Sequence, residues 1–311
     1  MVTARLGLLK PYKSIAEVNE YFKVEGLIRQ LRKDVLYSLE PKIDGMCVQV
    51  HRDSEGVAIL AGTTEITSKL PRLVEEIEGL PFESFDTHAE LVMLDSSGCY
   101  RPHEDIVAVA HRLIPYEGDR VIIVNFDLLT LEGTDFREST LQQRQDALRN
   151  IAMGAYPYRE GSQPDRFFNT IPYERVGYNE IEWAIKRNTT SEGVVLKAID
   201  STYSVQGGKD WWKLKWLHEC DVAIVGKRLV KNSICTYNYR VALLDDNGQL
   251  KEVGRTMNTN VQAEEGDILT VRCDRIIQYE DTFGLYLARV KELREDKRVP
   301  DSFALLRQRS D

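Results

Sequence analysis

Lys42 lies in a short polar string that could carry a nucleophile. The string is Glu40-Pro41-Lys42-Ile43-Asp44-Gly45. An amine attacks phosphorus only when it is unprotonated, so a site that uses a lysine in this way must hold positive charge beside it. A string of this length also occurs by chance, and alone it fits a surface lysine at a strand end. The residues that follow it in the sequence therefore carry the argument.

Charged and aromatic residues recur at the ends of apolar runs after Lys42. Glu90 ends one run, Phe126 lies in another, and Glu192 begins the string Glu192-Gly193-Val194-Val195-Leu196-Lys197. The remaining members of the set are Lys213, Lys215, Arg294, Asp296 and Lys297. Carboxylates, an aromatic ring and paired lysines are what a site needs to hold a nucleoside triphosphate and to move its α-phosphate onto an amine.

Each member of this set has a specific interpretation and a plainer one. Lys213 and Lys215 alternate with tryptophan and leucine, so they share one face of a strand, which suits either a row of phosphate contacts or an exposed face. Glu90 and Glu192 suit Mg²⁺, with Mn²⁺ as a substitute, although each alone fits a salt-bridged strand end. Phe126 alone would be a core residue, but in this order stacking on a purine is favoured. Lys42, Asp44, Lys197, Lys213 and Lys215 are the predicted catalytic residues.

Composition narrows the class of protein. The chain has 311 residues, 42% hydrophobic and 29% charged, which describes a globular protein long enough for two domains. Its net charge of −8 argues against indiscriminate nucleic-acid binding. No apolar stretch approaches the roughly 20 residues of a membrane span, and no signal peptide is predicted. The five cysteines are odd in number and form no Cys-x-x-Cys pair, which argues against structural zinc and favours a reducing cytoplasm.

The hydrophobic pattern changes near Trp216. Before it, strands mix with helices, which predicts an α+β domain over residues 1–216 with a short helical segment at its start, over residues 15–31. After it, strands dominate, which predicts a small β-barrel of the OB-fold type over residues 217–311. The barrel strands are expected at residues 222–224, 237–244, 249–254, 268–273 and 285–290, with a hairpin turn at Asp246-Asn247-Gly248.

The ordered set resembles the covalent nucleotidyltransferases, and specifically the ATP-dependent DNA ligases of the compact bacterial or bacteriophage type. The resemblance covers nearly all of residues 40–301. It implies an ATP-grasp-like nucleotidyltransferase domain with antiparallel sheets and flanking helices, followed by an OB-fold. It also implies a cytoplasmic monomer, in the host cytoplasm if viral, that seals nicked duplex DNA in repair, replication or recombination.

The resemblance also implies a role for each residue. Lys42 would carry AMP and pass it to a 5′-phosphate, which the 3′-hydroxyl then attacks. Glu40 would lie near the adenine amino group, Glu90 near the ribose or metal, and Phe126 on the adenine ring. Glu192 would bind the metal. The lysines at 197, 213 and 215 would surround the α-phosphate, and Arg294, Asp296 and Lys297 would orient the departing pyrophosphate.

Two departures from the family pattern leave other functions open. Cys47 occupies a position where the family usually has a ribose-binding arginine, and Leu60–Thr67 lacks a second arginine; Thr63, Thr64 or Arg52 would be substitutes. An RNA ligase, or a ligase tolerant of RNA-containing ends, is therefore the closest alternative. A capping guanylyltransferase fits less well, because the string at Glu192 is ligase-like. A non-enzymatic OB-fold protein that binds nucleic acid is disfavoured by the presence of Lys42 and Glu192.

Overall fold

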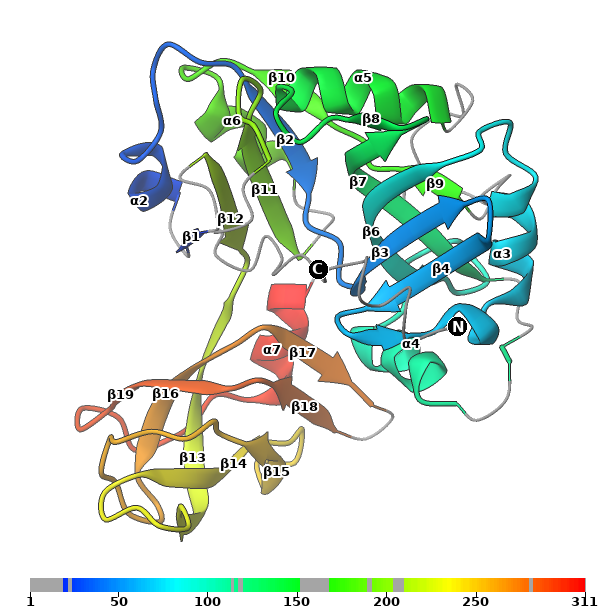
Figure 1. Ribbon diagram of the computed structural model, residues 1–311. Helices are drawn as coiled ribbons and strands as arrows, with labels where there is room; N and C mark the ends of the chain where they lie inside the picture. The colour runs from blue at the N-terminus through cyan, green and yellow to red at the C-terminus, as the bar shows by residue number, and fades with distance from the viewer. Residues whose placement is uncertain are drawn as a thin grey trace. The chain divides into compact units, whose positions relative to one another are not determined.

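The chain divides into two compact units, Met1–Lys215 and Trp216–Asp311. The computed structural model describes residues 19–21, 24–112, 115–116, 120–151, 168–188, 192–203, 210–279 and 282–310. The first unit mixes sheets and helices and the second is mainly β (Figure 1), so the predicted α+β class with a C-terminal OB-fold is confirmed. Among the described residues, no helix has both the length and the apolar character that a membrane crossing requires.

One sheet of the first unit carries most of the predicted site. Its strand order is β1-β12-β11-β2-β10, and the strands are Asn19–Tyr21, Trp211–Lys215, Gly193–Ala198, Tyr37–Pro41 and Glu174–Val176. Alternate side chains on its three central strands, including Leu39, Leu196 and Leu214, are buried. The short helix α2 (Val24–Ile28) contacts β12 and α6 (Ile181–Arg187). This packing leaves the opposite face of the three strands for polar residues.

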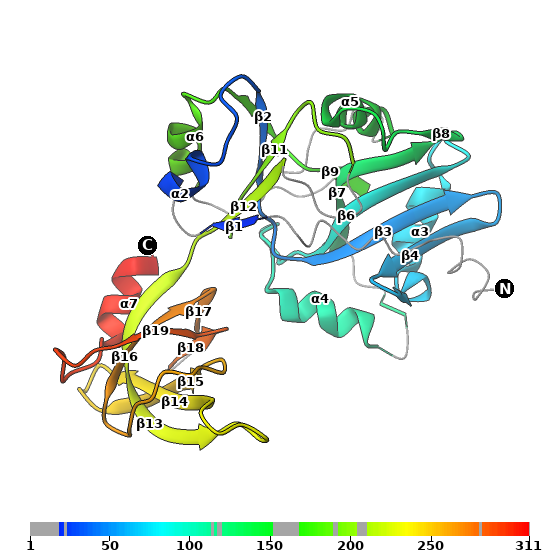
Figure 2. The same ribbon diagram turned by 60° about the vertical axis from the view of Figure 1, so that its left-hand side comes forward.

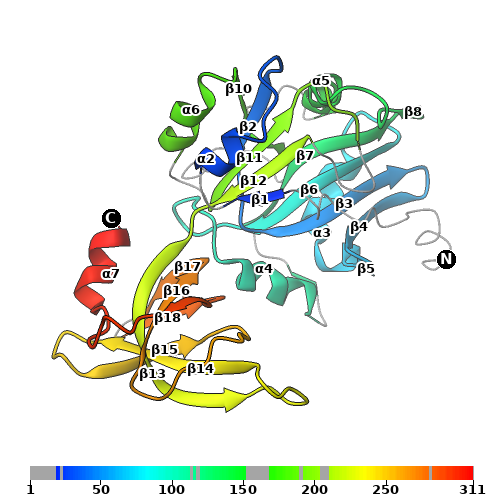
Figure 3. The same cartoon turned by 90° about the vertical axis from the view of Figure 1, so that its left-hand side faces the viewer.

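The second sheet of this unit carries the other predicted site residues of the unit that lie on strands, Glu90 and Phe126. Its order is β5-β4-β3-β6-β7-β8, with β9 parallel to β7, and the strands are Thr64–Glu65, Gly56–Ala61, Met46–Asp53, Phe85–Met93, Val121–Leu131, Thr134–Asp135 and Phe168–Thr170. Helix α3 (Pro71–Glu78) contacts β4 and β9, α4 (His103–Ala110) contacts β6 and β3, and α5 (Leu141–Ile151) contacts β7 (Figure 3). A short 3₁₀ turn, η1 (Thr67–Lys69), precedes α3. The core between β3, β4, β6, β7 and the helices is aliphatic, with Phe85 and Phe168 in ring contact.

The second unit is a β-structure with a terminal helix. A sheet in the order β15-β14-β13-β16-β19 contains Leu250–Arg255, Tyr237–Leu244, His218–Leu229, Ile268–Cys273 and Arg289–Leu293. The hairpin β17–β18 (Arg275–Gln278 and Phe283–Tyr286) and helix α7 (Phe303–Ser310) complete the unit. Phe303 of α7 packs on Phe283 with ring centroids 4.9 Å apart, which ties the helix to the core of this unit.

Two local expectations are wrong. The single strand expected at residues 285–290 is two strands, because Leu287 has a φ of 52° and interrupts the extended backbone. The helix expected over residues 15–31 is β1 followed by the five-residue α2 in its described part; residues 15–18 and 22–23 lie outside that part. Proximity to β12 explains the strand, since β1 pairs in parallel with Trp212–Leu214.

Candidate active site

One face of β2, β11 and β12 brings together residues that are far apart in the sequence. Strand β11 lies between β2 and β12 (Figure 2). Glu40 pairs with Val195, which pairs with Lys213, and Gly193 pairs with Lys215. Cross-strand partners lie on the same face, and so do residues two apart along a strand. This face therefore carries Ser38, Glu40, Lys42, Gly193, Val195, Lys197, Trp211, Lys213 and Lys215.

Lys42 lies at one end of this face. Its amine forms a short ion pair with Glu192, and its backbone N–H donates to the Gly193 carbonyl at 2.9 Å. The other oxygen of Glu192 lies 3.9 Å from the Lys215 amine, so one carboxylate lies between two cations. The predicted nucleophile, the predicted metal ligand and one predicted phosphate contact are thus neighbours.

Two glycines allow this close approach. A Cβ on Gly193 would lie 2.0 Å from the Leu214 carbonyl oxygen, and one on Gly45 would lie 2.4 Å from a methyl carbon of Val92. Neither position has room for a side chain. Both glycines of the motif strings are therefore explained by crowding of neighbouring strands around Lys42.

Lys197 lies at the opposite end of the same face. Its buried amine is 2.6 Å from Glu40, 4.2 Å from the centre of the Trp211 ring and 4.9 Å from that of Phe126. Lys197 is level with Ser38 in the strand register, four residues from Lys42 and therefore about 13 Å away along the strand. The structure thus brings Lys197 to Glu40, whereas it brings Lys215 to the Lys42 end.

A β-bulge on β7 positions Phe126. Ala89 pairs with Asn125, but the preceding His88 pairs with Asp127, so Phe126 is an extra residue. Glu90 pairs with Val124, and by alternation Glu90, His88, Val124, Phe126 and Asp127 all share one face. Phe126 is half-buried there and its carbonyl accepts a 3.2 Å hydrogen bond from Lys197.

Arg144 of α5 fixes the backbone beside Phe126. It is fully buried, and its guanidinium donates to both oxygens of Asp127 at 2.7 and 3.2 Å. It also donates to the carbonyls of Ser139 and Ser201 at 2.8 and 3.1 Å. A buried bidentate pair of this kind holds a strand in one position, because breaking it would leave a buried charge without a partner.

Glu90 contributes a carboxylate with altered acidity. Burial raises its pKa to about 8, and the nearby carboxylates of Asp44 and Glu192 act in the same direction. The Lys42 amine and a hydrogen bond from the Gly45 backbone lower it, but by less. Within the described part of the chain, no cluster of three or more His, Cys, Asp or Glu is arranged as a metal site. Two carboxylates that repel each other still fit Mg²⁺, which takes most of its ligands from water and phosphate.

The predicted C-terminal motif forms a separate network within the second unit. Arg294 donates to Asp296 through two nitrogens, each at 2.8 Å, and to Asp221 at 2.9 Å. Lys297 donates to Asp221 at 2.7 Å and to Asp301 at 2.8 Å. Both cations therefore already have carboxylate partners, and they would have to exchange these for phosphate oxygens in order to bind a nucleotide.

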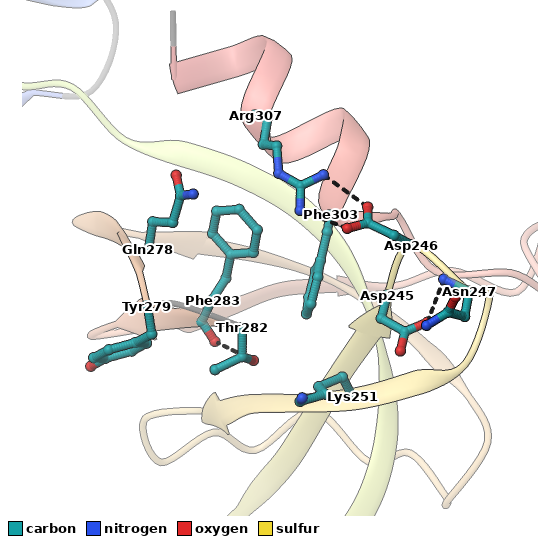
Figure 4. Close-up of a pocket in the computed structure, with 10 residues that line it drawn as sticks. All are labelled: Asp245, Asp246, Asn247, Lys251, Gln278, Tyr279, Thr282, Phe283, Phe303 and Arg307. Carbon is teal, nitrogen blue, oxygen red and sulfur yellow. Dashed lines mark hydrogen bonds and ion pairs between the residues drawn. The ribbon is translucent and has the colours of Figure 1, made fainter.

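A hollow of about 320 Å³ in the second unit contains none of the predicted site residues. Figure 4 shows Phe283 and Phe303 at its centre and Arg307 paired with Asp246, with two nitrogen–oxygen distances of 2.8 Å. Lys251 and Tyr279 also line it. Because Arg307 and Asp246 neutralise each other, the hollow offers no uncompensated charge from this pair, and we assign it no function.

The expected substitutes for the missing arginines differ in position. Arg52 donates to the carbonyls of Ile77, Leu80 and Glu78 at 2.7, 2.7 and 3.0 Å, so it caps the end of α3. Its guanidinium is thus already engaged. Thr63 is exposed in the turn before β5, and Cys47 is exposed on β3 opposite Glu90. Of these residues, Cys47 is the one paired across strands with a predicted site residue.

Sequence reasoning missed the supporting residues Arg144, Gln145 and Asp221. Gln145 donates to Glu40 at 2.9 Å and to Ser38 at 3.0 Å. The available signal for Arg144 and Gln145 was that they share one helical face with Leu141, Leu148 and Ile151. No such signal existed for Asp221, whose role depends on the pairing of β13 with β16 and on the loop at Lys297.

Comparison with known proteins identifies the family of the first unit. The family model "ATP dependent DNA ligase domain" matches residues 15–215. A probable DNA ligase of Kineococcus radiotolerans is 28% identical over 300 residues, covering 86% of this chain and 57% of that protein. One of Streptomyces coelicolor is 29% identical, covering 85% and 57%. The chain thus spans little more than half the length of these relatives.

Solved structures share the fold at low sequence identity. A structure titled "Pmar-Lig_Pre." has a TM-score of 0.68 at 17% identity and covers 90% of this chain and 68% of that one. A structure from a study of "Lig E DNA ligases" has a TM-score of 0.59 at 13% identity and covers 89% of this chain and 99% of that one. The family match extends over most of the chain and includes each motif of the first unit, from Lys42 to Lys215. The chain belongs to the ATP-dependent DNA ligase family.

Proposed function

We propose that this chain seals nicks in duplex DNA with ATP, by way of an AMP group carried on Lys42. The observation that supports this most directly is the grouping of Lys42, Glu192 and Lys215 at one end of a sheet face that also carries Lys213. The family assignment supplies the class of reaction. Because the relatives are longer, the substrate and the complete activity of this chain are part of the proposal.

The first step is attack of the Lys42 amine on the α-phosphorus of ATP. The Lys42 amine is paired with the Glu192 carboxylate, so it must leave this carboxylate and lose a proton before it attacks. The N–P bond then forms and pyrophosphate departs. Lys213 and Lys215, which share the face with Lys42, are placed to stabilise the charge on the α-phosphate.

Mg²⁺ is the proposed cofactor, with Mn²⁺ as a substitute. Glu90 and Glu192 would hold it, because they lie close enough for the Glu192 carboxylate to raise the pKa of Glu90. When bound, the ion would neutralise phosphate charge. Glu40 lies beside Lys197 toward the other end of the face, and the Lys197 amine is also 4.9 Å from the centre of the Phe126 ring of β7; we propose that the adenine base lies there.

Labelling with α-³²P-ATP and Mg²⁺, followed by denaturing electrophoresis, tests this function. Wild-type chain should retain label, whereas Lys42→Ala should retain none, and Lys42→Arg should also fail because guanidinium stays protonated. Lys42→Ala should still join a pre-adenylated nick to some extent, since that step needs no lysine nucleophile. Label on Lys42→Ala equal to that on the wild type would show that the nucleophile is another residue.

A further inference from the structure

Two buried polar atoms of residues that neighbour Ser38 have no hydrogen-bond partner among the residues that the structure describes. They are the side-chain oxygen Oε1 of Gln145 and the nitrogen Nη1 of Arg175. Gln145 is 3% exposed, and its Nε2 donates to Glu40 and Ser38. A carboxylate only accepts, so these bonds fix the amide with its nitrogen toward Glu40 and leave the oxygen without a donor. A buried polar atom in this state is unfavourable unless a ligand or water completes it.

The two atoms belong to the same part of the first unit. Arg175 on β10 is the cross-strand partner of Ser38 on β2, so the two side chains share a face and their Cβ atoms are about 5 Å apart. The Arg175 guanidinium lies 4.6 Å from the centre of the Tyr173 ring, and that of Arg149 lies 4.4 Å from the same ring. Arg149 follows Gln145 by one turn of α5, on the same side of the helix.

Glu40 provides a third polar group at this place. One of its oxygens is held by Lys197 at 2.6 Å, and the other accepts from Ser38 at 3.1 Å and from Gln145 at 2.9 Å. The carboxylate is therefore fixed in orientation by three donors. Together the groups present two acceptors, on Glu40 and Gln145, and one donor, on Arg175.

We propose that Gln145 and Arg175 read the base of the nucleotide and select adenine over guanine and hypoxanthine. This inference rests on the proposed use of ATP. The amino group of adenine carries two hydrogens, which match two acceptors, and the adjacent ring nitrogen accepts from Arg175. Guanine and hypoxanthine have an oxygen in place of that amino group, which would face the two acceptors, and a ring N–H in place of the accepting nitrogen, which would face the Arg175 donor. Gln145 and Arg175 thus determine specificity, with Gln145 also positioning Glu40.

Initial rates of Lys42 labelling with α-labelled ATP, ITP and GTP test the proposal. Wild-type chain should prefer ATP to ITP. In Gln145→Met and Arg175→Met, which keep side-chain volume, the ratio of kcat/KM for ATP to that for ITP should fall about tenfold, the effect of one lost hydrogen bond. Arg175→Lys, which keeps the charge, provides a milder variant if Arg175→Met unfolds.

Matched controls separate selection from packing. Gln142→Met changes an exposed glutamine of the same helix, and Arg149→Met removes the other guanidinium that stacks on Tyr173. Both should keep the wild-type ratio. Equal losses with ATP and ITP in the two test variants, or a wild-type chain that uses ITP as well as ATP, would overturn the proposal.

A binding measurement makes the test independent of catalysis. At equal concentrations, ATP should raise the unfolding temperature of the wild-type chain more than ITP does, since the tighter ligand stabilises the folded state more. This difference should shrink in Gln145→Met. Absence of Lys42 labelling with ATP would refute the proposed function alone, and equal stabilisation by ATP and ITP would refute the base selection alone.

Discussion

Gly193→Ala should damage both the stability of the first unit and its chemistry. The added methyl carbon would lie 2.0 Å from the Leu214 carbonyl oxygen and 3.0 Å from the Lys215 Cα, both of them backbone atoms. Non-bonded carbon and oxygen atoms need about 3 Å or more, so β11 and β12 would have to separate by roughly 1 Å. Overpacking of this kind costs about 1–3 kcal/mol in free energy of unfolding.

The same displacement would reach the site. The Gly193 carbonyl accepts from the Lys42 backbone N–H, and Lys215 is the cross-strand partner of Gly193. Moving these groups by about 1 Å can reduce the rate of a positioned reaction by roughly 100-fold. We therefore expect Lys42 labelling by ATP to slow to about this extent in Gly193→Ala, measured at a temperature where the variant is folded.

Gly62→Ala is the matched control. Gly62 has a φ of 59°, and a Cβ added there meets nothing within 4 Å. This variant carries backbone strain of about 1 kcal/mol without a collision. Chemical denaturation and single-turnover labelling should be compared for both variants. The reasoning fails if Gly193→Ala loses no more stability than Gly62→Ala and labels at the wild-type rate.

Three further variants test other parts of the site. Glu90 has a pKa raised to about 8, so its effect on stability is most favourable below the ordinary carboxylate pKa and declines as pH rises toward 8. Mg²⁺ affinity should rise over that pH range, and Glu90→Gln should remove this pH dependence of the affinity. If the dependence persists in Glu90→Gln, it arises from another titrating group. Asp221→Asn should lower the free energy of unfolding by about 2 kcal/mol at pH 7, because Lys297 and Arg294 lose a charged acceptor. Burial raises the pKa of Asp221 but hydrogen bonds from Lys297 and Thr270 lower it by more, so this difference should begin to shrink as pH falls below about 4 and be lost as pH falls through the depressed pKa of Asp221, as urea titrations would show. Cys47→Arg should lower the KM for ATP about tenfold and sharpen the preference for DNA over RNA at matched nicks. No change in either quantity would mean that having cysteine instead of arginine at position 47 has no functional consequence.

The sequence predicted the strands that have strict alternation or strong apolar runs. The strand expected at residues 237–244 has those bounds in the structure, and Lys213 and Lys215 do share a face. Local patterns could not predict that Leu287 would break a strand, because a positive φ at leucine depends on the surrounding fold. The roles of the individual site residues remain predictions.

The site was predictable as a set of residues but only in part as a geometry. The order of motifs indicated that Lys42, Glu192 and the paired lysines would act together. Lys197 lies beside Glu40 and level with Ser38, four residues along the strand from Lys42. This position follows from the register of β2 and β11. Strand register is set by long-range packing, which a single sequence does not display.

The extra residue at Phe126 also affects how changes in chain length would be tolerated. Elsewhere in a strand, loss of one residue reverses the alternation and turns every later side chain to the wrong side. At the bulge, loss of Phe126 would leave Asp127 following Asn125 on its present face, and the remainder of β7 would keep its register. A relative shortened here would thus retain the fold while lacking the ring. A gap at this position in an aligned pair of sequences would indicate a different binding partner for Lys197 rather than a different architecture.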